Sequence, residues 1–553
     1  MTTRLNDAGN SDLRPSYFDR PIPQILQQWN RIEPDRPFLQ EVDGPSQTYG
    51  ETLAESLRWA LGLRALGVAP GDRVVVLMPP KLETVNVWVG LGWLRAIDIP
   101  LNTEYKGEML RYVLDNSRSM VAICAERHLE AVVPLLPLVP RLKTVVVWRE
   151  TSADLPTGVD GITFHDSVDV IGATDIDSAD IGDGPALHDT ATVLYTSGTT
   201  GPSKGVVSPW GSFVNAGRRA GPPGGFQDDD IFYSTLPMYH AGGLNWIHGI
   251  AAAGGQWVFR ERMSTTSFWD DVRRYSCTTT FLLGAMANFL GRAEERPDDA
   301  DNPIRAIVAV PYPDSLNAFE KRFDLSVHTV YGMTEVGIVM KSDVPRPDEP
   351  NTGRPFAEYE MRVVDEFDVE VPHGTAGELV IRSREPWTMF SGYFEMEEAT
   401  QTAWRNLWFH TGDAMRRDEA GNFYFVDRIK DSIRRRGENI SSAEVESYLF
   451  RHDAVFECAA IPVPSEWGED DVKVCVVLKS GRTLREEELI LFLLGEGMPR
   501  FMIPRFVEFL ADLPRTPTGK IQKHVLRAAS RETPGWDRDA TMQEFIRRRD
   551  GGS

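Results

Sequence analysis

Apolar positions along the first third of the chain alternate between helical and strand spacing. Residues 53–67 repeat apolar side chains at helical spacing, and Gly71 and Asp72 turn the chain into the continuous apolar run 73–78. The same helix-type and strand-type patterns recur in residues 84–95, 109–116, 120–124 and 143–148. Strands that are apolar on both faces are typical of parallel sheets covered by helices. The pattern therefore predicts an α/β fold with a largely parallel, buried sheet.

The pattern changes farther along the chain. Residues 151–188 are rich in Asp, Gly and Ser, which predicts an irregular surface segment. Beyond residue 350, shorter runs at 359–364 and 377–381 predict a β-rich subdomain. After Asp427 a basic segment leads into a compact α+β pattern, which predicts a domain boundary there. The expected elements are helices near 442–450 and 486–496 and strands near 459 and 472–478, followed beyond residue 531 by a charged, weakly patterned tail.

Length and composition describe a folded protein of two to four domains. The chain has 553 residues, of which 42% are hydrophobic and 25% charged. Acidic residues outnumber basic ones by 81 to 59, a net charge of -22, which argues against a general nucleic-acid or anionic-membrane surface. An anionic ligand must therefore be held by local donors. The acidity itself is explained by solubility.

Cysteine usage and the N-terminus favour the cytoplasm. Four cysteines without a CxxC pair predict reduced thiols, with no structural disulfide and no zinc site. The first twelve residues lack the apolar core of a signal peptide, and no apolar run approaches the length of a membrane span. We expect no membrane and no nucleic-acid partner.

The segment from Tyr195 to Gly205 reads Tyr-Thr-Ser-Gly-Thr-Thr-Gly-Pro-Ser-Lys-Gly and follows an apolar strand-type run. Its glycines let backbone N–H groups face an anion, its hydroxyls add donors, and Lys204 adds a positive charge. It is not a Walker loop, because Ser203 stands where the second glycine would be. Two alternatives are a solvated linker and a nucleophile elbow built on Ser203. A polar loop of about eight residues separates Ser203 from the strand, which disfavours the elbow.

Together with six further motifs, this segment resembles the acyl-adenylate-forming family, which includes acyl-CoA synthetases, peptide-synthetase adenylation domains and luciferases. The resemblance runs from about residue 20 to 525. Its motifs, in family order, are residues 195–205, 237–240 (Pro-Met-Tyr-His), 331–335 (Tyr-Gly-Met-Thr-Glu), 353–355 (Gly-Arg-Pro), 410–413 (His-Thr-Gly-Asp), 427–440 and 514–520 (Pro-Arg-Thr-Pro-Thr-Gly-Lys).

The resemblance implies a reaction and a domain plan. A substrate carboxylate attacks the α-phosphate of Mg-ATP and releases pyrophosphate, and a thiol then displaces AMP. The implied plan is an AMP-binding adenylation domain over 1–426, a hinge over 427–431 and a small mobile α+β domain over 432–553. Because two anions must meet, cations and oriented donors have to offset their repulsion.

The resemblance also assigns roles in nucleotide binding. Thr334 donates to the α-phosphate, and Glu335 binds Mg²⁺, a hard cation that selects carboxylate and phosphate oxygens. Tyr331 stacks near the adenine, with core packing as its alternative. Asp413 accepts hydrogen bonds from the ribose hydroxyls and Arg428 contacts the same ribose; a turn-forming Gly-Asp pair is the alternative for Asp413. The expected ATP-binding residues are Thr196, Ser197, Gly198, Thr199, Thr200, Lys204, Tyr331, Gly332, Asp413 and Arg428.

The remaining roles concern the two half-reactions. Lys520 is implied as the adenylation catalyst, since a compact ammonium suits two reacting oxyanions. Lys430 occupies the hinge position, and rotation about it presents Lys520 first and the 436–439 loop second. In that loop Arg436, Gly437 and Glu438 are the expected CoA-binding residues, with a solvated basic turn as the alternative.

The acyl pocket departs from the family pattern. His240 is expected to gate the pocket, or else to be a core histidine, and Trp246 and Gly284 are expected to line it. Many members carry a Gly-Gly-Ala type turn before the Tyr-Gly-x-Thr-Glu motif, whereas residues 309–312 read Ala-Val-Pro-Tyr, and Pro311 removes a backbone donor. This turn and the sequence Arg-Gly-Glu-Asn-Ile-Ser are similar to the branch with carnitine and crotonobetaine CoA ligases. We therefore expect an acid other than a plain fatty acid.

The sequence thus predicts an ATP-dependent carboxylic acid–CoA ligase, with ATP, Mg²⁺ and coenzyme A as its cofactor and co-substrates. A carrier-protein phosphopantetheine is the alternative acceptor, and a second copy of the chain is a further candidate partner. A serine hydrolase using Ser203 and a non-catalytic nucleotide-binding protein are the alternatives from other classes.

Overall fold

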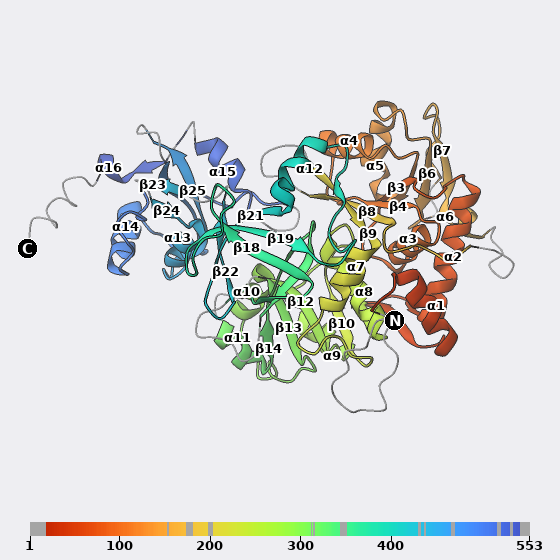
Figure 1. Cartoon of the computed structure of the whole chain (residues 1–553), viewed down its shortest axis with the longest axis horizontal. Coiled ribbons are helices and arrows are strands. Elements are labelled where there is room, and N and C mark those ends of the chain that lie inside the picture. Colours follow the sequence, from red (N-terminus) through yellow and green to blue (C-terminus); the bar gives the residue numbers. More distant parts are fainter. Residues whose placement is uncertain are drawn as a thin grey trace, which may run out of the picture. The chain divides into compact units, whose positions relative to one another are not determined.

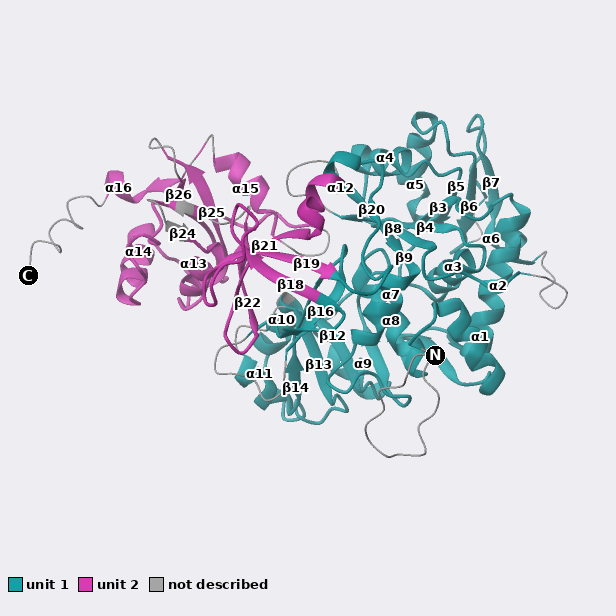
Figure 2. Ribbon diagram, in the orientation of Figure 1, with its two compact units in different colours: residues 1–196, 203–359, 383–400 teal, residues 197–202, 360–382, 401–553 magenta. Residues whose placement is uncertain are grey.

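The structure, a computed structural model, groups the chain into two compact units (Figure 2). The large unit comprises 1–196, 203–359 and 383–400, and the small unit comprises 197–202, 360–382 and 401–553. The described residues are 18–151, 154–172, 181–196, 203–310, 312, 316–342, 351–429, 433–435, 438–465, 470–516, 521–530, 533 and 535–541.

An eight-stranded sheet forms one layer of the large unit (Figure 1). Its strands, in spatial order, are β20 (Gly392–Tyr393), β9 (Lys204–Pro209), β8 (Thr190–Thr196), β4 (Ile97–Pro100), β3 (Arg73–Leu77), β5 (Val121–Ala125), β6 (Thr144–Trp148) and β7 (Thr163–Asp166). The pairs from β8 to β7 are parallel, whereas β8, β9 and β20 pair in antiparallel fashion. The predicted parallel sheet is therefore confirmed.

A second sheet of seven strands lies in the same unit. Its order is β14 (Ser326–His328), β13 (Ala306–Val310), β12 (Thr279–Leu283), β10 (Ile231–Ser234), β11 (Gln256–Phe259), β1 (Pro37–Glu41) and β2 (Ser46–Thr48). Only the β1–β2 pair is antiparallel in this sheet. A short antiparallel sheet follows, made of β15 (Val330–Met333), β16 (Gly337–Lys341) and β17 (Arg354–Pro355).

Helices lie between and outside the two large sheets. Successive strand residues point to opposite faces, so apolar strands need helices on both faces of the sheet. Val74 and Val76 of β3 share one buried cluster with Phe232 of β10 and with helices α1 (Ile22–Ile32), α2 (Tyr49–Ala65), α3 (Leu82–Trp93), α7 (Trp210–Arg219) and α8 (Ala241–Ala253). Val75 and Leu77 pack instead against α4 (Gly107–Asn116) and α5 (Leu129–Val132). The far face of the seven-stranded sheet packs against α9 (Phe268–Arg274), α10 (Gly284–Arg292) and α11 (Leu316–Phe323). The large unit thus has five alternating layers of helices and strands, as an α/β fold requires.

The small unit is β-rich before residue 429 and α+β after it. Its first sheet consists of β18 (Tyr359–Val364), β19 (Gly377–Ser383), β21 (Phe409–Arg417) and β22 (Phe423–Arg428), of which β18 and β19 were predicted. The remaining elements are β23 (Ile433–Arg435), β24 (Glu438–Ile440), α13 (Ser442–Leu449), β25 (Val455–Pro464), β26 (Asp470–Leu478), α14 (Glu486–Gly495), β27 (Phe506–Phe509), α15 (Lys523–Ser530), β28 (Trp536–Asp537) and α16 (Arg538–Thr541). The helices and strands expected between 442 and 496 are confirmed. The boundary at residue 427 stays a prediction.

Two segments differ from the prediction. Residues 151–188, expected to be irregular, contain β7, which extends the parallel sheet beside β6, and α6 (Ser167–Gly172). The tail beyond 531, expected to be weakly patterned, adds β28 to the sheet of the small unit beside β27. Both strands are short and contain one aromatic residue each, so their structure depends on pairing with a neighbouring strand more than on local propensity.

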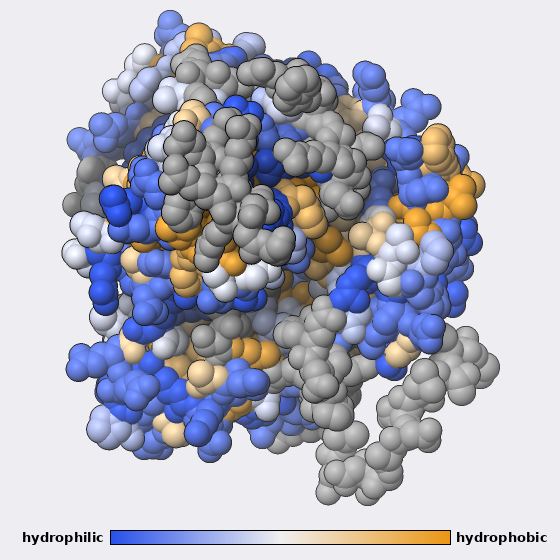
Figure 3. Space-filling model, turned by 90° about the vertical axis from the view of Figure 1, so that its left-hand side faces the viewer, coloured by the Kyte–Doolittle hydropathy of each residue, from blue (hydrophilic) through white to orange (hydrophobic). Residues whose placement is uncertain are grey.

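Hydrophilic side chains predominate on the face shown in Figure 3, where apolar residues form separate small patches. No helix in the described parts of the chain is long and apolar enough to cross a bilayer. All four cysteines are buried free thiols, and burial raises the pKa of Cys124 to about 12.

His248 of α8 makes the stability of the large unit depend on pH. The ring is fully buried, and its Nε2 lies 2.9 Å from the carbonyl oxygen of Arg20. Burial and the nearby positive charge of Arg218 lower the pKa of His248 to about 4, although the hydrogen bond to Arg20 opposes this. The unfolded chain, with a pKa near 6.5, therefore binds a proton before the folded chain does as the pH falls.

We expect His248→Gln, which keeps an N–H donor for Arg20, to flatten this pH dependence. Wild type should lose up to about 3 kcal/mol relative to the variant between pH 7 and pH 4, because each pKa unit corresponds to about 1.4 kcal/mol. Urea unfolding followed by tryptophan fluorescence at several pH values measures the difference. Parallel curves for the two proteins would contradict the prediction.

Candidate active site

The ends of the glycine-rich segment are held by a β-hairpin in the large unit. Thr196, the last residue of β8, pairs across the hairpin with Lys204, the first residue of β9. The Thr196 hydroxyl lies 3.4 Å from the Lys204 carbonyl oxygen. A nucleophile elbow runs from a strand through a sharp turn into a helix. Here the chain returns as an antiparallel strand, so the hydrolase built on Ser203 lacks its structural basis. Ser197, Gly198, Thr199 and Thr200 lie outside the described residues.

Thr334 and Glu335 lie in the tight turn that joins β15 to β16. The turn needs Gly332, because a Cβ added there would meet the Gly337 carbonyl oxygen at 2.2 Å. Gly337 itself has a φ of 70°, a conformation that favours glycine. Tyr331 is buried in β15. The motif thus fixes the backbone of Glu335, whose carbonyl oxygen also accepts a 2.8 Å hydrogen bond from the N–H of Phe390.

Tyr393 joins two residues that the sequence predicted from separate motifs. Its hydroxyl donates to Glu335 Oε1 at 3.0 Å, and its ring centroid lies 4.5 Å from the Lys204 ammonium nitrogen. Burial and the neighbouring Glu335 carboxylate raise the pKa of Tyr393, so its hydroxyl keeps its proton. Sequence reasoning missed this residue. In the sequence Tyr393 stands in a short Gly-Tyr pair, which belongs to none of the seven motifs and shows no periodic pattern.

The residues at this site fit a magnesium ion that is shared with a nucleotide. No group of three or more His, Cys, Asp or Glu side chains within the described ranges could hold a metal ion by itself. Mg²⁺ is usually bound by one or two carboxylates together with substrate phosphates and water. A single carboxylate such as Glu335, linked through Tyr393 to Lys204 of the segment expected to bind phosphate, suits this mode.

The residues expected at the acyl pocket lie on α8 and α10 of the large unit. His240 precedes α8 as its N-cap residue, with its ring 4.8 Å from that of Tyr239. Trp246 is buried and stacks on Phe232 at 5.5 Å. It also lies 5.1 Å from the ring of Phe281 in β12, the strand that ends directly before Gly284. The aromatic packing gives Trp246 a core role in addition to the predicted one. Pro311 lies outside the described residues.

In the small unit, the predicted ribose-binding residues contact each other. Asp413 of β21 and Arg428 of β22 are cross-strand partners, and Arg428 Nε lies 3.1 Å from Asp413 Oδ1. Asp413 is buried, whereas half of the Arg428 side chain is exposed. Glu378 of β19, which the sequence did not single out, holds the preceding residues: it accepts the Gly412 N–H at 3.1 Å and lies 2.9 Å from His410 Nδ1. The Asp413 carboxylate is thereby fixed beside a cation. Lys430 lies outside the described residues.

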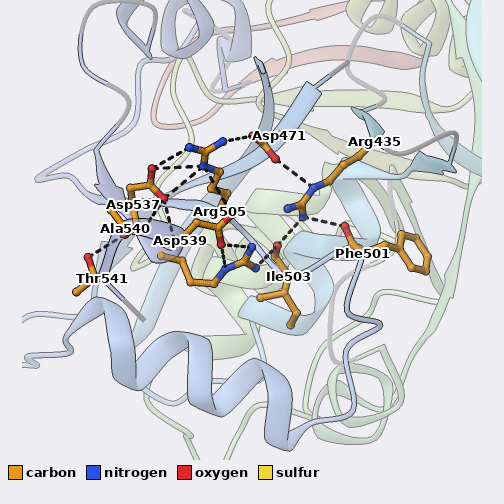
Figure 4. A network of polar contacts seen from close by, with 10 residues as sticks. Arg435, Asp471, Phe501, Ile503, Arg505, Asp537, Asp539, Ala540 and Thr541 are labelled. Atoms are coloured by element: carbon orange, nitrogen blue, oxygen red, sulfur yellow. Dashed lines mark hydrogen bonds and ion pairs between the residues drawn. The ribbon is translucent and has the colours of Figure 1, made fainter. Parts of the chain in front are cut away.

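The hairpin expected to bind CoA begins at a buried arginine. Arg435 of β23 pairs with Glu438 of β24 along the backbone, and Arg436 and Gly437 between them lie outside the described residues. Arg435 donates to the carbonyl oxygens of Phe501 and Ile503, both at 3.0 Å (Figure 4). Its Nε also lies 3.2 Å from Asp471 Oδ1.

The same polar network reaches the end of the described chain. Arg505 donates to Asp471 at 2.8 Å and lies 3.1 Å from Asp537 of β28 (Figure 4). Arg538 donates to the Ile503 carbonyl oxygen at 3.1 Å. Strand β23 is therefore attached to β26 and, through Arg505, to the C-terminal strand.

Lys520 itself lies outside the described residues, but both ends of its segment are held. Arg515 and Ile521 form an isolated antiparallel bridge, and the Gln522 N–H donates to the Pro514 carbonyl oxygen at 2.7 Å. The described residues on the two sides of this segment therefore lie side by side in the small unit.

Comparisons with known proteins define the class of this chain. The family described as "AMP-binding enzyme" matches residues 26–394, and the family described as "AMP-binding enzyme C-terminal domain" matches residues 444–520. A crotonobetaine/carnitine–CoA ligase of Salmonella paratyphi C is 31% identical over 496 residues, which cover 87% of this chain and 93% of that protein. A protein of the same name from Proteus mirabilis is 29% identical and covers 86% and 92%.

Solved structures show the same fold. ATP-bound MatB from Rhodopseudomonas palustris gives a TM-score of 0.81 at 24% identity and covers 93% of this chain and 99% of its own. An anthranilate CoA ligase in complex with anthranoyl-AMP gives a TM-score of 0.81 at 24% identity and covers 94% and 98%.

The chain belongs to the AMP-binding enzyme family, as its seven motifs predicted. Its expected class, the AMP-forming acid–thiol ligases of the acyl-adenylate-forming family, is thereby confirmed.

Proposed function

We propose that this enzyme is an ATP-dependent carboxylic acid–CoA ligase that forms an acyl adenylate and pyrophosphate, and then acyl-CoA and AMP. The observation that carries the proposal is that Lys204 and Glu335 of the large unit both contact Tyr393. A cation next to a glycine- and hydroxyl-rich segment suits a polyphosphate, and the carboxylate suits the metal that accompanies it.

The residues have separate tasks in this reaction. Lys204 and the segment that it closes hold the phosphates, and Thr334 donates to the α-phosphate. Mg²⁺, held by Glu335, would reduce the negative charge that the incoming carboxylate meets. Asp413, with Arg428 at 3.1 Å, offers two acceptor oxygens to the ribose hydroxyls. Lys520 offsets the charge of the two reacting oxyanions, and residues 436–438 serve the later step with CoA.

The acid is proposed to differ from a plain fatty acid. Relatives at about 30% identity are named as crotonobetaine/carnitine–CoA ligases, and Pro311 replaces a glycine-type turn next to the expected pocket. His240, Trp246 and Gly284 are the proposed pocket residues. Small carboxylic acids with a quaternary ammonium group are therefore the first substrates to test.

Product analysis with a panel of acids tests the proposal. The protein is incubated with ATP, Mg²⁺ and CoA together with aliphatic, aromatic, polycyclic or betaine acids, and the nucleotide and acyl products are identified. We expect AMP, pyrophosphate and acyl-CoA in equal amounts. Production of ADP and phosphate, with no AMP for any acid, would exclude the proposed function.

The acceptor is tested in the same experiment. Replacing CoA by a phosphopantetheine-bearing carrier protein distinguishes the ligase from a stand-alone enzyme that loads such a carrier. A cytoplasmic location and a homodimer stay predictions.

A further inference from the structure

We propose that Tyr393 is a positioning residue for nucleotide binding, which places the Lys204 ammonium and the Glu335 carboxylate for a magnesium-bound triphosphate. The inference rests on the proposed function and extends it to a residue outside the seven motifs. Tyr393 contacts two groups of opposite charge through different parts of one side chain.

Backbone pairing sets the position of Tyr393 relative to the phosphate-binding hairpin. Tyr393 pairs with Val206 of β9, two residues after Lys204. On either side, the Ser391 N–H donates to the Val207 carbonyl oxygen at 2.8 Å and the Phe394 N–H donates to that of Gly205 at 2.7 Å. The segment 391–394 is thus bonded along the strand that begins at Lys204, which places the ring beside the ammonium group.

Neighbouring residues also fix the direction of the ring. Gly392 of β20 has a φ of 146°, and a Cβ there would lie 3.1 Å from Thr400 Cγ2, so the backbone just before Tyr393 favours glycine. The Phe390 ring packs 5.1 Å from the Tyr393 ring, and the Phe390 N–H holds the Glu335 backbone. The hydroxyl is therefore directed at Glu335 by the same short segment that fixes the Glu335 main chain.

The chemistry of a tyrosine suits a site that must later accept a metal and phosphates. A direct ion pair between Lys204 and Glu335 would have to break before either residue could bind its ligand. A cation over an aromatic face is attracted by the ring quadrupole, and a neutral hydroxyl leaves the carboxylate its full charge. The Tyr393 hydroxyl is a neutral group that donates to Glu335 Oε1 at 3.0 Å. Both charged groups are held in place and remain available to bind their ligands.

Two substitutions separate the two contacts. Tyr393→Phe keeps the ring beside Lys204 and removes only the hydroxyl that faces Glu335, whereas Tyr393→Leu removes both. Tyr233→Phe is the matched control, since the Tyr233 hydroxyl donates to the Asp271 carboxylate at 2.8 Å in another part of the large unit. Each full-length protein is titrated with ATP by calorimetry, once with Mg²⁺ and once with a chelator.

We expect Tyr393→Phe to weaken ATP binding in the presence of Mg²⁺ about tenfold, the usual scale for a hydrogen bond to a charged group, with little change in the chelator. Tyr393→Leu should weaken binding under both conditions, because Lys204 loses its support. In pyrophosphate exchange, the Mg²⁺ concentration for half-maximal rate should rise for Tyr393→Phe. Tyr233→Phe should match wild type in every measurement.

Two results would overturn the inference. One is wild-type binding of ATP with Mg²⁺ by Tyr393→Phe, and the other is an equal loss with and without Mg²⁺, which indicates a general structural role. Failure of the proposed function looks different: wild type would then produce no AMP with any acid, while the comparison of ATP binding would still decide the role of Tyr393.

Discussion

Replacing Lys520 by alanine is expected to slow acyl-adenylate formation by about a hundredfold to a thousandfold, the usual cost of losing one charge-stabilising donor. The physical reason is the approach of a carboxylate to a phosphate, in which both reacting groups are anionic. Transfer of a supplied acyl adenylate to CoA has no such encounter and should remain near the wild-type rate. Pyrophosphate exchange measures the first step, and acyl-CoA formation from synthetic adenylate measures the second.

The described residues on both sides of Lys520 are held in place. Arg515 pairs with Ile521, and Lys523, at the start of α15, lies 2.9 Å from the partly buried Glu446. Lys479→Ala, which removes an exposed lysine of the same unit, is the control and should leave both steps unchanged. Near-normal pyrophosphate exchange by Lys520→Ala, or an equal loss of both steps, would contradict the assignment.

The sequence predicted the fold best where apolar runs are long. The runs 73–78, 120–124 and 143–148 coincide with buried strands, in which every second side chain enters a core on one face and the others enter a core on the opposite face. Strands β7 and β28 were not predicted, since Thr163–Asp166 and Trp536–Asp537 are too short, with one aromatic residue each, to show an apolar pattern. Each is a strand because an existing edge strand offers it backbone partners, and that information lies far away in the sequence.

Some residues of the candidate site were likewise predicted from the sequence, and one was not. The family motifs predicted Thr196, Lys204, Asp413 and Arg428 as separate ATP-binding residues. Cross-strand pairing brings them together as Thr196 with Lys204 and Asp413 with Arg428. Tyr393 was not predicted. Its contact with Glu335 joins residues 58 positions apart through the pairing of β20 with β9, which leaves no periodic signal. The roles of these residues in catalysis stay predictions.

Replacing Asp471 by alanine is expected to destabilise the small unit by about 3–5 kcal/mol, the usual cost of removing one partner of a buried ion pair. Only 5% of the Arg435 side chain is exposed, and Asp471 is its carboxylate partner as well as a partner of Arg505 (Figure 4). Without Asp471, Arg435 loses the carboxylate that lies 3.2 Å from its Nε and keeps its two carbonyl acceptors. Hydrogen exchange in β26 and α14, measured by mass spectrometry, should become faster.

The two half-reactions should slow by different amounts in Asp471→Ala, because Arg435 holds the strand that leads into residues 436–438. At a temperature at which the variant is folded, acyl transfer to CoA should slow more than pyrophosphate exchange, since the first depends on the placement of β23 and the second on Lys520. Glu496→Ala is the control: Glu496 lies 3.5 Å from Arg451 in an exposed pair, and such pairs contribute little. Equal slowing of both half-reactions by Asp471→Ala would mean that the network stabilises the unit without positioning β23, and unchanged hydrogen exchange would contradict its role in stability.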